Sequence, residues 1–230
     1  MIPIILSVLM LILAFIVLYI NMRRMKQLQT NHGVEIQHLQ QALLAAQCDS
    51  RDLYFSRILD GGFFRTEEEL ISAGTALNIY FPYGFFIVLS AKLETWGELF
   101  TTGHMNIKDL YFILRNVLED TFPGHTNAAE VQGHMIAILN LDNLPEAGLW
   151  GIVQDAQHAL EVLEAEFGLT VTVAISRVYH TPVELSHAMH DVNDIFDYLQ
   201  LMDIDSPITT YEDLTYLNIS QSTTSILDLE

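Results

Sequence analysis

The first 22 residues carry no charged side chain, and Arg23 is the first charged residue of the chain. Only Pro3 and Ser7 interrupt the apolar run from Ile2 to Ile20. At a rise of 1.5 Å per residue, a helix over this run would extend roughly 28 Å, which is enough to cross the hydrocarbon core of a bilayer. The run therefore predicts a transmembrane helix over residues 1–21, with the lipid bilayer as the partner of residues 2–20.

Three cations, Arg23, Arg24 and Lys26, follow this run directly. The positive-inside rule predicts a single-pass protein of the plasma membrane whose C-terminal domain is cytoplasmic. The alternative is a cleaved signal peptide, which requires a basic segment before the apolar run and a cleavage site flanked by small residues. Neither is present, so the sequence favours a membrane anchor.

The rest of the chain is strongly acidic. The whole sequence has 10 basic and 29 acidic residues and a net charge of −19, which divides into +2 for residues 1–48 and −21 for residues 49–230. Direct nucleic-acid binding by this chain is not expected, because phosphate contacts need clustered Lys and Arg. Half of the residues are hydrophobic, which argues against disorder. The single cysteine, Cys48, excludes an intramolecular disulfide framework.

Residues 22–57 are polar and rich in glutamine, with apolar residues spaced three and four apart at Ile36, Leu39, Leu43 and Ala46. This spacing is typical of a coiled-coil seam. However, the same register also places four polar residues on the seam: Gln29, His32, Ser50 and Arg57. The segment is therefore either a solvated helical stalk or a parallel coiled coil, and the coiled coil would make the protein a homodimer.

From residue 52 onwards, hydrophobic periodicity and capping residues predict alternating helices and strands. The expected order is β-α-β-β-α-β-α-β, and its first six elements have the ferredoxin-like topology. We therefore predict an α+β domain over residues 58–215, with a nucleotidyl-cyclase-like sheet, followed by an acidic polar tail over 216–230. The expected helices are 52–59, 66–77, 106–120, 145–167 and 181–202, and the expected strands are 83–93, 128–132, 133–141, 169–176 and 208–211.

One helix carries candidate metal ligands. His187 and His190 are three residues apart, with Asp191 and Asp194 close by and His180 just upstream. Helical i,i+3 spacing can bring two imidazoles to one metal ion. The sequence fixes no third ligand, so an exposed polar helix face is the stronger interpretation.

The stretch from Ile175 to Tyr198 resembles the strand and helix of a diguanylate-cyclase-like (GGDEF) domain. It is more closely similar to the degenerate version in membrane-bound AraC-type transcription regulators of Firmicutes. The resemblance covers about residues 50–215. It implies a cyclase-like fold, placed in that family after a membrane sensor and a stalk and before a helix-turn-helix, which this sequence lacks.

The resemblance also locates the signature loop of the cyclases, at Gln132, Gly133, His134, Met135 and Ile136. One glycine remains, and His134 and Met135 stand where the two acids belong. On the first strand, the metal-ligand positions fall on Ser90 and Lys92, and neither is a hard anionic ligand. The resemblance thus implies no catalytic residue, no metal and no cofactor.

These observations lead us to expect a membrane-anchored, non-catalytic signalling module, the sensor or relay part of a transcription-regulator-like protein. The alternative is a module that binds a nucleotide or another small molecule in the degenerate cyclase pocket.

Overall fold

The computed structural model describes residues 46–94, 106–122, 124–144 and 148–214. The expected transmembrane helix, most of the stalk and the acidic tail lie outside these ranges. Among the described helices, none combines the length and the apolar character that crossing a membrane requires.

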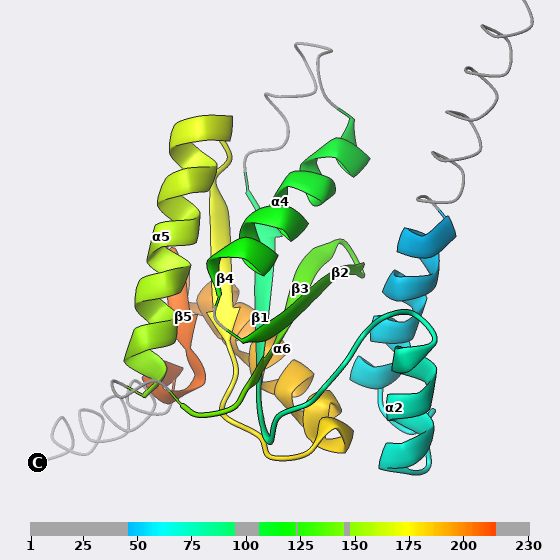
Figure 1. The fold of residues 1–230 in the computed structure, drawn as a ribbon. Coiled ribbons are helices and arrows are strands. Elements are labelled where there is room, and N and C mark those ends of the chain that lie inside the picture. The colour runs from blue at the N-terminus through cyan, green and yellow to red at the C-terminus, as the bar shows by residue number, and fades with distance from the viewer. Residues whose placement is uncertain (1–45, 95–105, 123, 145–147, 215–230) are drawn as a thin grey trace, which may run out of the picture. The chain divides into compact units, whose positions relative to one another are not determined.

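A mixed five-stranded sheet forms the centre of the domain, in the order β2-β3-β1-β4-β5 (Figure 1). Strand β1 is antiparallel to both β3 and β4, β2 is antiparallel to β3, and β5 joins β4 in parallel. The first four strands thus have the ferredoxin-like order, and the α+β fold class and the order of elements are confirmed. The strands are β1 (Phe85–Leu93), β2 (His125–Val131), β3 (His134–Leu141), β4 (Val171–Ile175) and β5 (Ile208–Thr210).

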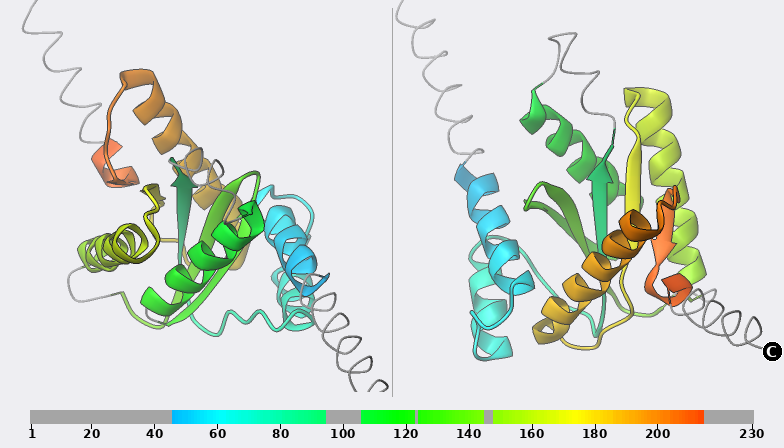
Figure 2. Two further views of the ribbon diagram at one scale, coloured as in Figure 1. Left: turned by 90° about the horizontal axis from the view of Figure 1, so that it is seen from above. Right: turned by 180° about the vertical axis from the view of Figure 1, so that it is seen from behind.

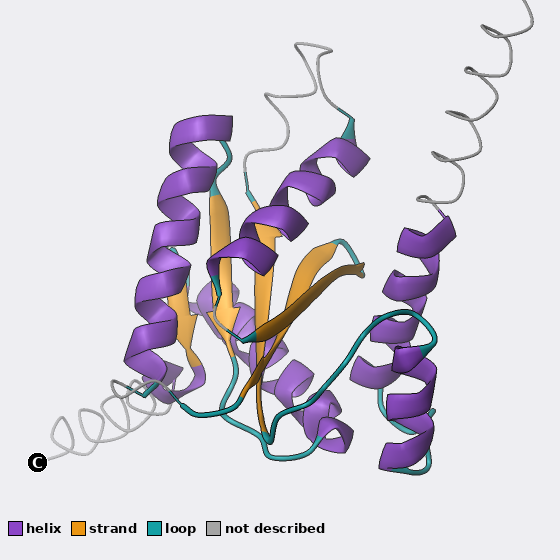
Figure 3. Ribbon diagram, in the orientation of Figure 1, coloured by secondary structure: helices purple, strands orange, loops and turns teal. Residues whose placement is uncertain are grey.

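Helices cover both faces of the sheet (Figures 2 and 3). On one face, α4 and α5 pack over a core that includes Ile87, Leu89 and Met135. On the other face, α6, α2 and the helix over residues 46–59 share a second core with Val88 and Ile136. The helices are α2 (Glu67–Thr75), α4 (Ile107–Thr121), α5 (Leu149–Phe167) and α6 (Leu185–Met202), and α6 follows a 3-10 turn at Pro182–Glu184.

The capping residues begin the helices where the sequence predicted. The Asn106 side chain accepts from the Asp109 amide while the Asp109 carboxylate accepts from the Asn106 amide, which completes a capping box. Thr181 and Glu184 form the same arrangement before α6. Gly168, at φ 65°, ends α5 in the left-handed conformation that glycine adopts readily.

The helix over residues 46–59 includes the last residues of the segment that we expected to form the stalk. Its side chains Tyr54, Phe55 and Ile58 are buried in the second core. The compact unit begins at Asp49 and so includes most of this helix. We expected two separate helices here, a stalk up to residue 57 and a short helix over 52–59, and the structure has one continuous helix over the described part, residues 46–59.

Candidate functional site

The signature-loop residues form the turn between β2 and β3 and the first residues of β3. Gln132 and Gly133 have φ values of 53° and 83°, the two positive values of a tight type I′ hairpin turn. The turn is held on both sides: the Tyr111 hydroxyl donates to the Gly133 carbonyl at 2.8 Å, and the Gly133 amide donates to Glu130 Oε1 at 3.1 Å. The loop is therefore a fixed feature of the fold.

The next three residues of the signature lie on β3. Met135 and Ile136 are both fully buried and pack into the cores on opposite faces of the sheet. His134, like Gln132 of the turn, lines a cleft. In this chain, then, the position that the resemblance assigns to an acid beside His134 is a core methionine.

His134 is hydrogen-bonded to one of the residues on the first strand. Its Nδ1 lies 3.2 Å from the hydroxyl of Ser90, which is fully buried on β1. The imidazole also packs edge-to-face against Phe196 of α6, with ring centroids 5.1 Å apart. Burial, with the nearby Lys92 cation, lowers the pKa of His134 below its ordinary value, so the neutral ring is favoured.

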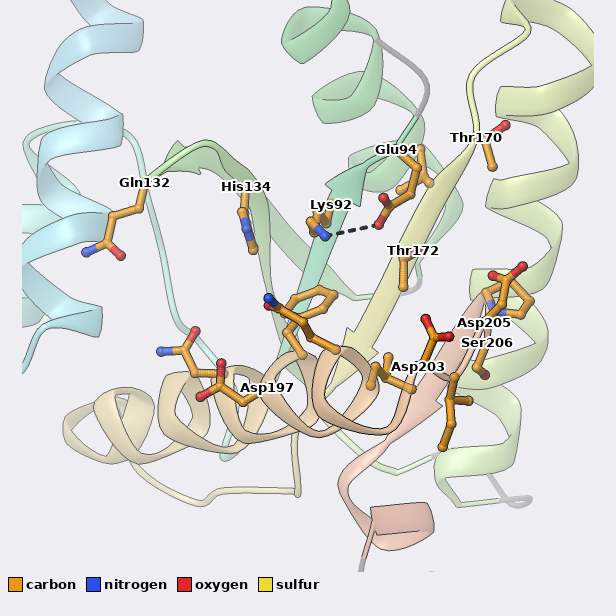
Figure 4. A pocket seen from close by; sticks show the side chains of 17 residues that line it. Lys92, Glu94, Gln132, His134, Thr170, Thr172, Asp197, Asp203, Asp205 and Ser206 are labelled. Carbon is orange, nitrogen blue, oxygen red and sulfur yellow. Dashed lines mark ion pairs between the residues drawn. The ribbon is translucent and has the colours of Figure 1, made fainter. Parts of the chain in front are cut away.

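The second position on the first strand, Lys92, forms an ion pair with Glu94 at 3.3 Å. Both side chains are almost half exposed, so this pair contributes little to stability. Lys92 and His134 both line the cleft (Figure 4). A hydroxyl, an imidazole and a paired lysine thus occupy three of the positions that the resemblance assigns to metal ligands or acids.

The cleft has a volume of about 910 Å³ and lies between the sheet and α6. Its walls come from the ends of β1, β3 and β4, from the C-terminal half of α6 and from the loop before β5. The charged residues that line it are Lys92, Glu94, Asp197, Asp203 and Asp205. Carboxylates outnumber cations, so the cleft would repel a polyphosphate unless divalent cations accompanied it.

The candidate metal ligands are not brought together. His187 and His190 are exposed on α6, and Asp191 is buried. Across the parts of the chain that the structure describes, no group of three His, Cys, Asp or Glu side chains could hold a metal ion.

Asp191 is instead the acceptor of a compact polar network. Its carboxylate accepts from Arg177 Nε at 3.0 Å, from Arg177 Nη2 at 2.7 Å and from the Tyr179 hydroxyl at 2.7 Å. The guanidinium of Arg177 also lies over the Tyr211 ring, 4.4 Å from its centroid. This network joins the loop after β4 to α6, and residue spacing gave no signal for it.

No protein-family model matches the sequence, and no curated protein matches it significantly. Among solved structures, the chain is similar to the GGDEF domain of TpbB (YfiN) from Pseudomonas aeruginosa, at 16% identity and a TM-score of 0.43 over 66% of this chain and 91% of that one. It is also similar to the coiled coil and GGDEF domain of DgcB from Caulobacter crescentus, solved in complex with c-di-GMP. That match has 14% identity and a TM-score of 0.40 over 81% of this chain and 98% of the other. The ferredoxin-like topology rests on the strand order and registers of this chain itself.

Proposed function

We propose that this chain is a membrane-anchored, non-catalytic signalling module whose domain has a cyclase-like fold. The observation that carries the proposal is the pair Ser90 and His134. These residues bond to each other at 3.2 Å in positions that the resemblance assigns to the catalytic and metal-binding region. A hydroxyl and a neutral imidazole supply no negative charge to hold the two divalent cations of a cyclase.

The catalytic side of the proposal is tested by incubating the purified full chain with GTP or ATP and magnesium. We expect no cyclic or linear dinucleotide, while an active diguanylate cyclase at the same concentration serves as the positive control. Product formation that depends on this chain would overturn the proposal.

The anchor and the stalk complete the proposed module. Residues 2–20 would hold the chain in the plasma membrane with the domain on the cytoplasmic side, and residues 22–57 would pair two copies. A rotation or piston movement of the span would then change the relative placement of the two domains. Such a relay would suit the regulatory part of a transcription-regulator-like protein.

Two measurements test these parts separately. Alkaline carbonate extraction should leave the chain in the membrane fraction, and release into the soluble fraction would remove the anchor from the proposal. Cysteines introduced at Leu39 and Leu43 should trap covalent dimers, and monomers throughout would remove the paired stalk.

A second candidate function is ligand binding in the cleft. It is favoured by the size of the cleft and by the aromatic pair His134 and Phe196 at one of its walls. A thermal-shift screen with nucleotides, including cyclic di-GMP, discriminates between the two. Because the cleft is acidic, a nucleotide should stabilise the protein only when magnesium is present, and stabilisation by none of them would leave the relay function alone.

A further inference from the structure

Strand β2 is one edge of the sheet. Side chains of other elements form hydrogen bonds with backbone amides that face outward from this edge. Val131 pairs with His134 across the two-residue turn, so the odd-numbered residues of β2 bond to β3. The even-numbered residues therefore point their amides away from the sheet. Two of these amides, at Ala128 and Glu130, donate to carboxylates of other elements.

Each carboxylate is also bonded to an arginine. Asp52 Oδ1 accepts from the Glu130 amide at 3.1 Å and from Arg115 Nη2 at 2.8 Å. Glu119 Oε1 accepts from the Ala128 amide at 2.8 Å and from Arg51 Nη2. We call this set the edge clasp: Arg51, Asp52, Arg115 and Glu119.

The edge clasp joins the stalk-proximal helix to the domain. Arg51 and Asp52 belong to the helix over residues 46–59, whereas Arg115 and Glu119 belong to α4. The apolar anchors of the first helix, such as Phe55 and Leu59, follow the clasp in sequence. The turn that carries Arg51 and Asp52 can therefore be displaced while the rest of the helix stays packed in the core.

The closed clasp keeps polar groups away from water, and this burial costs free energy. Arg51 Nε and the Thr126 hydroxyl are buried without a hydrogen-bond partner. Burial also raises the pKa of Asp52 and lowers the pKa of Arg51, although the neighbouring opposite charges oppose both shifts. Opening the clasp hydrates these groups again, and the free energy gained offsets part of the free energy of the hydrogen bonds that are broken.

Once uncovered, the β2 edge of one copy is complementary to the β2 edge of a second copy. In an antiparallel pair of two β2 strands centred on Ala128, Thr126 of one copy faces Glu130 of the other, and His125 faces Val131. No like charges oppose each other. Unpaired edge amides and carbonyls are a template for strand pairing, which native proteins commonly block with charged side chains.

We propose that the β2 edge is a latent interface for a second copy of this chain, which the edge clasp closes and movement of the stalk-proximal helix opens. This inference rests on the proposed relay function and gives it a contact surface. Displacing Arg51 and Asp52 frees the Glu130 amide and removes the arginine from Glu119. Once the Glu119 side chain also turns away from the Ala128 amide, the two sheets can join along their β2 edges.

Site-directed cross-linking of the full chain tests this interface. In a Cys48→Ser background, Thr126→Cys and Glu130→Cys are introduced together, because these positions would face each other between copies. Within one copy they are separated by about 13 Å of strand, so a shorter bismaleimide linker joins only two copies. Thr126→Cys alone is the register control, since its two thiols, one from each copy, would also be about 13 Å apart.

Removing one clasp residue should increase the cross-linked dimer. Asp52→Ala removes two charge-assisted hydrogen bonds, from Arg115 and from the Glu130 amide, which shifts the opening equilibrium by at least about tenfold, so the yield should rise several-fold. Asp60 is an exposed acid directly after the same helix. Asp60→Ala should therefore leave the yield unchanged. An unchanged yield in Asp52→Ala, or an equal rise in Asp60→Ala or in the single-cysteine control, would overturn the proposal.

Two further measurements keep the test interpretable. Hydrogen exchange at the Ile138 amide, in the middle of β3, shows whether a variant remains folded, and Asp52→Asn replaces Asp52→Ala if it does not. Its yield is judged by the same criteria. The Leu39 and Leu43 cross-links report the stalk alone, so a failure of the paired stalk and a failure of the β2 interface give different results.

Discussion

Replacing Asp191 by alanine should destabilise the domain through the donors that it leaves behind. The Asp191 side chain is 3% exposed, and its carboxylate accepts from the side chain and the backbone amide of Arg177 and from the Tyr179 hydroxyl. Burial and the hydrogen bond to Asp191 raise the pKa of Tyr179 to about 12. The carboxylate is thus the common acceptor of three groups on the loop after β4.

The magnitude follows from which donors can be rehydrated. The Arg177 side chain is 53% exposed, so its guanidinium regains water and the ion pair itself accounts for less than about 1 kcal/mol. The Arg177 amide and the Tyr179 hydroxyl are more enclosed, and each lost bond costs about 1 kcal/mol. The free energy of unfolding should therefore fall by about 2–3 kcal/mol, which corresponds to about 5–10 °C in Tm for a domain of this size.

Urea denaturation followed by circular dichroism measures this loss. Asp194→Ala is the matched control, because Asp194 lies one turn further along α6 and is exposed. It should leave the midpoint essentially unchanged. A loss below about 1 kcal/mol for Asp191→Ala would show that these bonds do not hold the loop to α6 and would refute the reasoning.

Three further predictions concern the turn, the cleft and a helix cap. Gln132→Asn should raise the free energy of unfolding by roughly 0.5–1 kcal/mol in the same urea assay, because asparagine tolerates the left-handed conformation of this position better. His134 has a lowered pKa in the folded protein, so its stabilising contribution is present above pH 6.5 and is lost as the pH falls towards the folded pKa. His134→Gln should flatten this part of a stability–pH profile, and an unchanged profile would contradict the assignment. Glu184 has a pKa lowered by amide hydrogen bonds, so Glu184→Gln should be less stable than the parent at neutral pH and should converge with it below about pH 4.5, as thermal unfolding at several pH values would show.

The order of elements was predictable because each one carries a local signal. Asn106 and Thr181 indicate where their helices begin through capping, and strict alternation marks the strand that begins near Leu169. One boundary that differed was the start of β2, expected at Ala128 and found at His125. Thr126 and Asn127 are polar, and they lie in the strand because they pair with Leu139 and Ile138 of β3, which the local sequence does not reveal.

Part of the candidate site could also be predicted from the sequence, and part could not. The position of the hairpin turn at Gln132 and Gly133 followed from the sequence, since two strand patterns meet there. The bond between Ser90 and His134 could not be predicted, because it depends on the register of β1 against β3. Asp191 looked like a neighbour of candidate metal ligands, but its side chain turns inward to Arg177.

The excess of acidic residues has a structural use that the composition did not reveal. With 10 basic residues for 29 acidic ones, most carboxylates cannot find a cation, and several bond to backbone amides, with or without a cation beside them. Such amide-bonded carboxylates cap helices and bends in several places and also close the edge of the sheet: Glu69, Asp109, Glu184, Asp213, Asp52 and Glu119. Each bond satisfies a donor that would otherwise need water or a neighbouring strand. The same chemistry that terminates the helices therefore also keeps the β2 edge closed, and a single displaced helical turn is enough to release part of that edge.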